Sequence, residues 1–186
     1  MKIAIIVGST RPNRKGLEVA QWVFGLASQR SSAQYELVDI AEYNLPLLDE
    51  PVPAAMGSPP TQEHTKRWAA KIASFDGYVF VTPEYNHGPS AALKNALDFL
   101  YKEWQNKSAG FVGYGAAGAA RSIEMLRAIC SNLELADVRV AVGLTLAHDF
   151  EKFTTFKPQP HQEKTLSQLL DQVEAWAGAL TPLRKS

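Results

Sequence analysis

The stretch KIAIIVGSTRPNRKG, residues 2–16, decides which fold the sequence predicts. Ile3 to Val7 form a continuous apolar run rich in β-branched residues, which is typical of a strand buried on both faces of a parallel sheet. Gly8 ends this run, and from Gly16 onward the apolar residues recur at nearly helical spacing. We therefore expect a buried strand, a turn and then a helix, the opening of an α/β domain.

The same alternation continues along the chain. Expected strands span residues 3–7, 35–40, 77–82, 108–114 and 138–146, and expected helices span residues 16–30, 61–74, 90–103, 119–133 and 162–180. A proline-rich stretch, 46–60, and a second stretch, 147–161, are expected to be loops. Five strands alternating with five helices imply a parallel sheet covered by helices on both faces. The 186 residues are expected to form one such domain, spanning 1–186.

Two strand orders are compatible with this alternation. The dinucleotide-binding order needs Gly-x-Gly-x-x-Gly in the first turn, and residues 8–16 lack it. The flavodoxin-like order 2-1-3-4-5 needs no such motif, so we predict a three-layer flavodoxin-like sandwich with a five-stranded parallel sheet. Such a sheet places its ligand at the ends of strands 1, 3 and 4, and the loops that follow these strands are therefore the candidate site.

The first of these loops has the chemistry of an anion site. Free backbone N–H groups and the positive end of the following helix favour a phosphate there. The residues expected to contribute hydroxyl groups, positive charge and the helix start are Ser9, Thr10, Arg11, Arg14, Lys15 and Gly16. A solvated basic turn that only precedes the helix is the alternative interpretation.

The second and third loops favour a flat ligand. Pro83, Glu84, Tyr85 and Asn86 follow the third strand, where they supply an apolar wall and backbone amides. Asn86 could instead be present only for the turn that Gly88 and Pro89 complete. After the fourth strand, the run of glycines and alanines at 113–118 includes Gly115 and lets the backbone approach a ligand closely.

The motifs GSTRPNRKG, PEYNHG and LKNALDFL together resemble the NAD(P)H-dependent FMN reductase family, which includes quinone reductases, azoreductase-type enzymes and chromate-reducing flavoproteins. The resemblance implies that Ser9 and Arg11 bind the FMN phosphate, that the segment 83–86 lines the isoalloxazine and ribityl chain, and that Gly115 lies near the pyrimidine side of the ring. Many members have Ser and Asn where this chain has Arg14 and Gly16, so Arg14 or Lys15 is expected to replace the lost contact. The resemblance also implies a homodimer or a dimer of dimers.

Charge and composition narrow the function further. Lys plus Arg and Asp plus Glu both number 19, so the formal net charge is zero, and neither nucleic acid nor an anionic membrane is an expected partner. Cys130 is the only cysteine, which rules out an intramolecular disulfide and a thiolate metal cluster. The chain shows neither a signal peptide nor a transmembrane stretch, so the expected location is the cytoplasm. No metal site is expected, because the histidines lack partners at ligand spacing.

These observations favour an FMN-dependent NAD(P)H oxidoreductase that passes hydride to quinones, azo compounds or similar small acceptors. Flavin chemistry needs no catalytic acid or base from the protein, and we assign none; His87 is interpreted either as a substrate contact or as an exposed turn residue. The alternative function is a flavodoxin-type electron carrier without turnover, which the neutral charge and basic first loop disfavour. A phosphorelay receiver is excluded, because it needs an Asp where the third strand ends in Thr-Pro-Glu.

Three local features have interpretations that bear on packing. The aromatic residues Phe99, Tyr101 and Trp104 form either an internal cluster or an association face between subunits. Thr61 is expected to cap the second helix, and the adjacent acids Asp49 and Glu50 are expected to lie in a solvated turn. Two further expectations concern side chains on helices: a core position for Cys130 and a surface ion pair between Lys94 and Asp98.

Overall fold

A five-stranded parallel sheet forms the centre of the computed structural model, which describes residues 1–184. Its strands are β1 (Lys2–Val7), β2 (Gln34–Asp39), β3 (Gly77–Pro83), β4 (Lys107–Gly115) and β5 (Leu135–Thr145). They are arranged in the order β2-β1-β3-β4-β5, and each neighbouring pair is parallel. The flavodoxin-like order predicted from the sequence is therefore confirmed. The apolar runs of β1 and β3 are buried along nearly their whole length, as expected for central strands.

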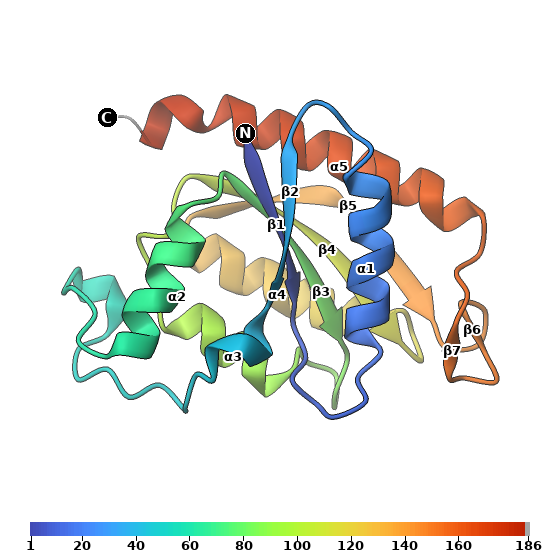
Figure 1. The fold of residues 1–186 in the computed structure, drawn as a ribbon, viewed down its shortest axis with the longest axis horizontal. Coiled ribbons are helices and arrows are strands. Elements are labelled where there is room, and N and C mark those ends of the chain that lie inside the picture. Colours follow the sequence, from blue (N-terminus) through green and yellow to red (C-terminus); the bar gives the residue numbers. More distant parts are fainter. Residues whose placement is uncertain (185–186) are drawn as a thin grey trace.

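Helices cover both faces of this sheet (Figure 1). One face is covered by α1 (Gly16–Ala27) and α5 (His161–Ala179), and the other by α2 (Glu63–Ala73), α3 (Ala91–Asp98) and α4 (Ala120–Asn132). Because side chains of a strand alternate between faces, the sheet divides the buried apolar residues into two clusters. No helix within residues 1–184 is long and apolar enough to cross a lipid bilayer.

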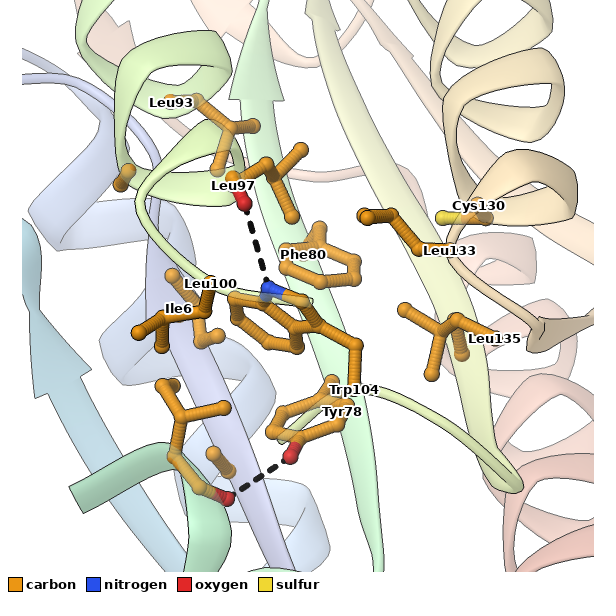
Figure 2. Close-up of a cluster of buried hydrophobic side chains, with 14 of the residues drawn as sticks. Ile6, Tyr78, Phe80, Leu93, Leu97, Leu100, Trp104, Cys130, Leu133 and Leu135 are labelled. Carbon is orange, nitrogen blue, oxygen red and sulfur yellow. Dashed lines mark hydrogen bonds between the residues drawn. The ribbon is translucent and has the colours of Figure 1, made fainter. Parts of the chain in front are cut away.

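The cluster under α2, α3 and α4 is dominated by aromatic rings (Figure 2). Trp104 is fully buried, packs edge-on against Tyr78 at 4.9 Å between ring centroids, and donates its indole N–H to the carbonyl of Leu97. The Tyr78 hydroxyl donates to the carbonyl of Ile72 at 2.8 Å. Each polar end of these large side chains is thus paired inside the core, which avoids the cost of burying a free donor.

The helix expected over 90–103 is shorter in the structure, because α3 ends at Asp98 and turns follow. This change of direction carries Phe99 and Trp104 inward, where their exposed fractions are 2% and 0%. Their interpretation as an association face is therefore wrong, and internal packing is confirmed. The expected core position of Cys130 and the ion pair between Lys94 and Asp98 are also confirmed.

The stretch after β5 departs from the expected loop. Its residues form an antiparallel hairpin from β6 (Phe150–Glu151) and β7 (Thr155–Phe156). Two residues of the turn, Lys152 and Phe153, have positive φ angles of 51° and 59°. Non-glycine residues rarely adopt this conformation, which is why the sequence rules for hairpins did not identify the turn.

The loop between β2 and α2, which includes the proline-rich stretch 46–60, contains two short 3-10 helices, η1 (Ile40–Tyr43) and η2 (Ala54–Met56). A third, η3 (Thr181–Arg184), follows α5. Asn95 of the LKNALDFL motif fastens this loop to α3. Its amide donates to the carbonyl of Pro46 at 2.7 Å and accepts from the backbone N–H of Leu48 at 3.0 Å. The motif therefore has a structural role that is independent of any ligand.

One expectation for the same region is wrong, and a second is confirmed only for Asp49. Helix α2 begins at Glu63, and its N-terminus is capped by the carboxylate of Glu50, which accepts from the backbone N–H groups of Thr61 and Gln62 at 3.0–3.1 Å. Thr61 is thus a donor to the cap and not the cap itself. The adjacent acid, Asp49, is exposed as expected, and its carboxylate lies 3.0 Å from the His64 ring nitrogen.

Candidate functional site

The loop between β1 and α1 is held by hydrogen bonds at its start and is exposed to solvent along its middle. The N–H of Gly8 donates to the carbonyl of Val81 at 2.8 Å, and the Ser90 hydroxyl donates to the carbonyl of Gly8. Ser9 is buried, whereas Thr10 and Arg11 are exposed. Since Ser90 also caps α3, this one side chain joins the first loop to the helix that follows the second loop.

The remaining charges of the first loop already have partners. The Arg14 guanidinium pairs with the Asp39 carboxylate at the end of β2, and both side chains are largely buried. Lys15 donates to Glu18 at 2.8 Å on the exposed side of α1. Of the three basic side chains expected at the phosphate, Arg11 is thus the one without an acidic partner among the described residues. That Arg14 or Lys15 replaces a lost phosphate contact stays a prediction.

Buried donors without a partner are concentrated at this loop. Among residues 1–184, four buried side-chain polar atoms lack a hydrogen-bond partner: Arg14 Nε, Thr65 Oγ1, Tyr114 OH and Thr145 Oγ1. Two of the four, on Arg14 and Tyr114, lie at the first loop, where Tyr114 reaches Gly16 from β4. Buried donors normally find acceptors, so their presence at a helix N-terminus fits a site that receives an anion with several oxygens.

The second loop makes a tight turn at the end of β3. Tyr85 and Gly88 exchange backbone hydrogen bonds of 2.9 and 3.0 Å, and the two residues between them, Asn86 and His87, have φ angles of 50° and 69°. Two consecutive positive φ angles are characteristic of a type I′ hairpin turn. Tyr85, Asn86 and His87 are all exposed at its tip, while Pro83 is buried in the strand. Asn86 therefore serves the turn, and the exposed surface of Tyr85 is available to a ligand.

Glu84 is committed to the neighbouring helix. Its carboxylate accepts from the backbone N–H groups of Arg121 and Ser122 at 3.0 and 3.3 Å, and from Nε of Arg121 at 2.7 Å. Burial alone would raise the pKa of Glu84, but these bonds lower it below its ordinary value. The Ser122 hydroxyl also donates to the carbonyl of Pro83 at 3.0 Å. Glu84 thus clasps the second loop to the start of α4, and its side chain has no free acceptor role in the expected ligand site.

The third loop brings Gly115 beside the second. A Cβ at Gly115 would lie 3.5 Å from Cβ of Glu84, an ordinary contact, and its carbonyl accepts from Leu146 at 3.1 Å. Gly118 has a different role, because a Cβ there would lie 3.2 Å from the backbone of Gly143 on β5. The glycines expected to allow close approach of a ligand are therefore partly required for packing of the turn against β5.

The structure thus brings every residue of the expected site to one edge of the sheet, at the carboxyl ends of β1, β3 and β4. Thr10 also borders a groove whose other walls come from η1, the residues after it and α3 (Ile40, Ala41, Asn44, Leu45, Ala92 and Asn95). An anion-binding loop beside an exposed aromatic residue and a backbone turn suits a flat ligand with a phosphate tail.

The family model described as NADPH-dependent FMN reductase matches residues 1–149. The chain belongs to this family. A relative from Nectria sp, an NAD(P)H-dependent FMN reductase, is 47% identical over 126 residues, which cover 65% of this chain and 63% of that protein. The chain thus matches less than two thirds of that relative's length. A 2-hydroxy-1,4-benzoquinone reductase from Burkholderia sp is 32% identical over 142 residues, covering 73% of each chain.

A solved structure supports the fold. The flavoenzyme NAD(P)H:(acceptor) oxidoreductase FerB from Paracoccus denitrificans superposes with a TM-score of 0.73, covering 96% of this chain and 97% of that one at 21% identity. As an FMN reductase family member, this chain has residues that fit the cofactor's phosphate at the first loop, where two buried donors lack partners. The hairpin β6–β7 and helix α5 lie beyond the matched residues.

Sequence reasoning missed two residues that lie at this candidate site. Tyr114 was assigned only to a strand, and Asp39 was not singled out, although its carboxylate anchors Arg14. A signal for Tyr114 existed in Gly16, because a glycine is an unusual first residue for a helix. The missing Cβ leaves room for a group arriving from another element, and Tyr114 fills that room.

Proposed function

We propose that this chain is an FMN-dependent NAD(P)H oxidoreductase with a quinone as its electron acceptor. The observation that carries the proposal is the convergence of the anion-binding first loop and the Tyr85 turn at one sheet edge, in a chain of the FMN reductase family. FMN, when bound, supplies the redox chemistry by accepting hydride from a nicotinamide and passing two electrons on.

The side chains have roles in binding and orientation. Ser9, Thr10 and Arg11 hold the phosphate together with the free N–H groups at the start of α1, where the helix dipole favours negative charge. Arg14 pairs with Asp39 and contributes positive charge at the loop. The exposed ring of Tyr85 and the backbone near Gly115 would border the flavin ring.

The choice of acceptor follows from the relatives. The Burkholderia relative is named for reducing a hydroxybenzoquinone, and a planar quinone would suit the exposed surface beside Tyr85. Azo compounds are a further proposed class, since they share flatness and two-electron reduction. The chain is also proposed to be a homodimer or dimer of dimers and to act in the cytoplasm.

The proposal is tested by FMN binding and turnover. The purified protein should bind FMN, and the loaded protein should oxidise NADH or NADPH with a benzoquinone as acceptor. Arg11→Ala should weaken FMN affinity about tenfold or more, since a hydrogen bond to a charged group contributes about 1.5–3 kcal/mol. Isothermal titration of the apoprotein with FMN measures this change.

The matched control is Lys15→Ala, which removes a neighbouring positive charge that is already paired with Glu18. Its effect on FMN affinity should be clearly smaller. A protein that binds FMN but shows no turnover with any nicotinamide and quinone would instead be an electron carrier. A protein that binds no FMN would overturn the proposed function altogether.

A further inference from the structure

Tyr114 is a tyrosine whose hydroxyl has no assigned use. It is the second-last residue of β4, paired in register with Pro83 of β3 and Leu144 of β5. Its ring packs in the apolar cluster on the α1 side of the sheet, and only 7% of the residue is exposed. Its hydroxyl oxygen is buried and has no hydrogen-bond partner among residues 1–184. Phenylalanine would fill the same space without this unpaired donor.

The hydroxyl lies directly against the start of α1. A Cβ built on Gly16, the first residue of that helix, would be 2.7 Å from the Tyr114 oxygen. Helix α1 begins without a side-chain cap, so its first N–H groups are free. Glycine at position 16 thus lets a tyrosine from the sheet bring one more donor to a helix N-terminus that already presents several.

The surroundings of the hydroxyl keep it protonated. Burial is the largest influence and raises the pKa of Tyr114 well above its ordinary value, and the neighbouring Tyr85 raises it further. The smaller effects of Ser9, Arg11 and Arg14 lower it. The group is therefore a neutral donor at physiological pH. The neighbouring Nε of Arg14 is a second buried donor in need of an acceptor. The acceptor that would satisfy both donors is an anion with several oxygens.

We propose that Tyr114 is a specificity residue whose hydroxyl donates a hydrogen bond to the FMN phosphate, so that the site selects FMN over riboflavin. The inference rests on the proposed function, since it assigns a further residue to the same flavin site. Riboflavin has no phosphate and leaves the Tyr114 hydroxyl unpaired, whereas FMN provides its acceptor. Selectivity then comes from a buried donor that only the phosphorylated ligand can satisfy.

The experiment compares the binding of two flavins to two matched variants. Apoprotein is titrated with FMN and with riboflavin, and quenching of flavin fluorescence gives each Kd. Tyr114→Phe should weaken FMN binding about tenfold and leave riboflavin binding unchanged, because a hydrogen bond to a charged group is lost only with FMN. Tyr85→Phe, which removes an exposed hydroxyl at the same sheet edge, should leave the ratio of the two Kd values at its wild-type value.

Stability of the apoprotein provides an independent readout. Urea unfolding without flavin should give Tyr114→Phe a free energy of unfolding at least as large as that of wild type, since the change removes an unpaired buried donor. If Tyr114→Phe keeps the wild-type ratio of FMN to riboflavin affinity, the assignment of Tyr114 is overturned. FMN binding by the wild-type protein would still support the proposed function in that case. A large loss of apoprotein stability would also overturn it, by showing that the hydroxyl has a structural partner.

Discussion

Gly118 and Gly25 show how differently the chain uses its glycines at the scale of single residues. Gly118 has a φ of 62°, and a Cβ there would lie 3.2 Å from the Gly143 backbone, which cannot move without disturbing β5. Gly25 lies on the exposed side of α1, and a Cβ there would meet nothing within 4 Å. The first glycine is therefore required by the β4–α4 turn, and the second only weakens a helix.

Substitution by alanine should change the free energy of unfolding in opposite directions at these two positions. Gly118→Ala should lower the free energy of unfolding by about 2 kcal/mol, from the left-handed backbone and the close contact together. Gly25→Ala should raise it by about 0.5–1 kcal/mol, because alanine loses less backbone entropy in a helix. Urea unfolding of the apoproteins measures both. A neutral Gly118→Ala would mean that the turn adopts another conformation.

At the scale of elements, two helices of the same face obtain their N-terminal caps from distant carboxylates. Neither α2 nor α4 has a side-chain cap of its own at the N-cap residue. Glu50 supplies the cap for α2 from the proline-rich loop, and Glu84 supplies it for α4 from the end of β3. Each carboxylate also stabilises the positive end of its helix dipole. Capping and tertiary attachment are thus the same interaction in this protein.

Glu50 should make stability depend on pH in the acid range. Burial alone would raise the pKa of Glu50, but hydrogen bonds from Thr61 and Gln62 lower it from 4.5 to about 2. A carboxyl whose pKa is lowered by folding stabilises the protein fully above its unfolded pKa, and this contribution disappears as the pH falls through the folded pKa. Glu50→Gln should therefore lower the free energy of unfolding by about 1 kcal/mol at pH 7.

The difference between Glu50→Gln and wild type should shrink as the pH is lowered from about 4.5 to about 2. Urea unfolding at several pH values measures it. Glu163→Gln is the control, because Glu163 lies exposed in the first turn of α5. A difference that stayed constant across this pH range would show that the Glu50 charge has no part in the cap.

At the scale of the whole molecule, two apolar clusters share one sheet, and we expect them to unfold together. Trp68 and Trp104 are fully buried in the cluster under α2, α3 and α4, and Trp22 and Trp176 lie on α1 and α5 of the other face, so tryptophan fluorescence reports on both faces. Far-UV circular dichroism reports on the helices of both faces. The two signals should give the same thermal midpoint, as one domain over residues 1–186 requires.

Thermal unfolding also tests whether the protein is a dimer. If unfolding is coupled to dissociation of a dimer, the midpoint should rise with protein concentration. Separate midpoints for fluorescence and circular dichroism would contradict the single domain. A midpoint independent of concentration would contradict the proposed dimer.

Strand order and the convergence of the three expected loops at one sheet edge followed from the sequence, because buried strands and the loops after them have strong local patterns. Ile3–Val7 predicted β1, and the absence of Gly-x-Gly-x-x-Gly after it favoured the observed order. The partners of the site side chains did not follow. Arg14 pairs with Asp39 and Glu84 with Arg121, over separations of 25 and 37 residues, and no local pattern encodes such pairs.

The hairpin β6–β7 and the inward position of Trp104 could not be predicted for related reasons. Lys152 and Phe153 occupy turn positions that sequence rules reserve for glycine or asparagine. The segment 99–104 leaves the helical path although its composition suits a helix, because the space between α2 and the sheet accepts its rings. In the second case tertiary packing overrides local preference.

The ordered β1–α1 loop, in which Asp39 anchors Arg14, has a consequence for the kinetics of cofactor binding. Hydrogen bonds within the β1–α1 loop, from Arg14 N to the Arg11 carbonyl and from Gly8 N to Val81, already order its backbone. The conformational entropy of this loop is therefore lost during folding and not during association. A preorganised loop keeps the encounter with a phosphate close to rigid docking, so differences in affinity among loop variants should arise mainly from the rate of release.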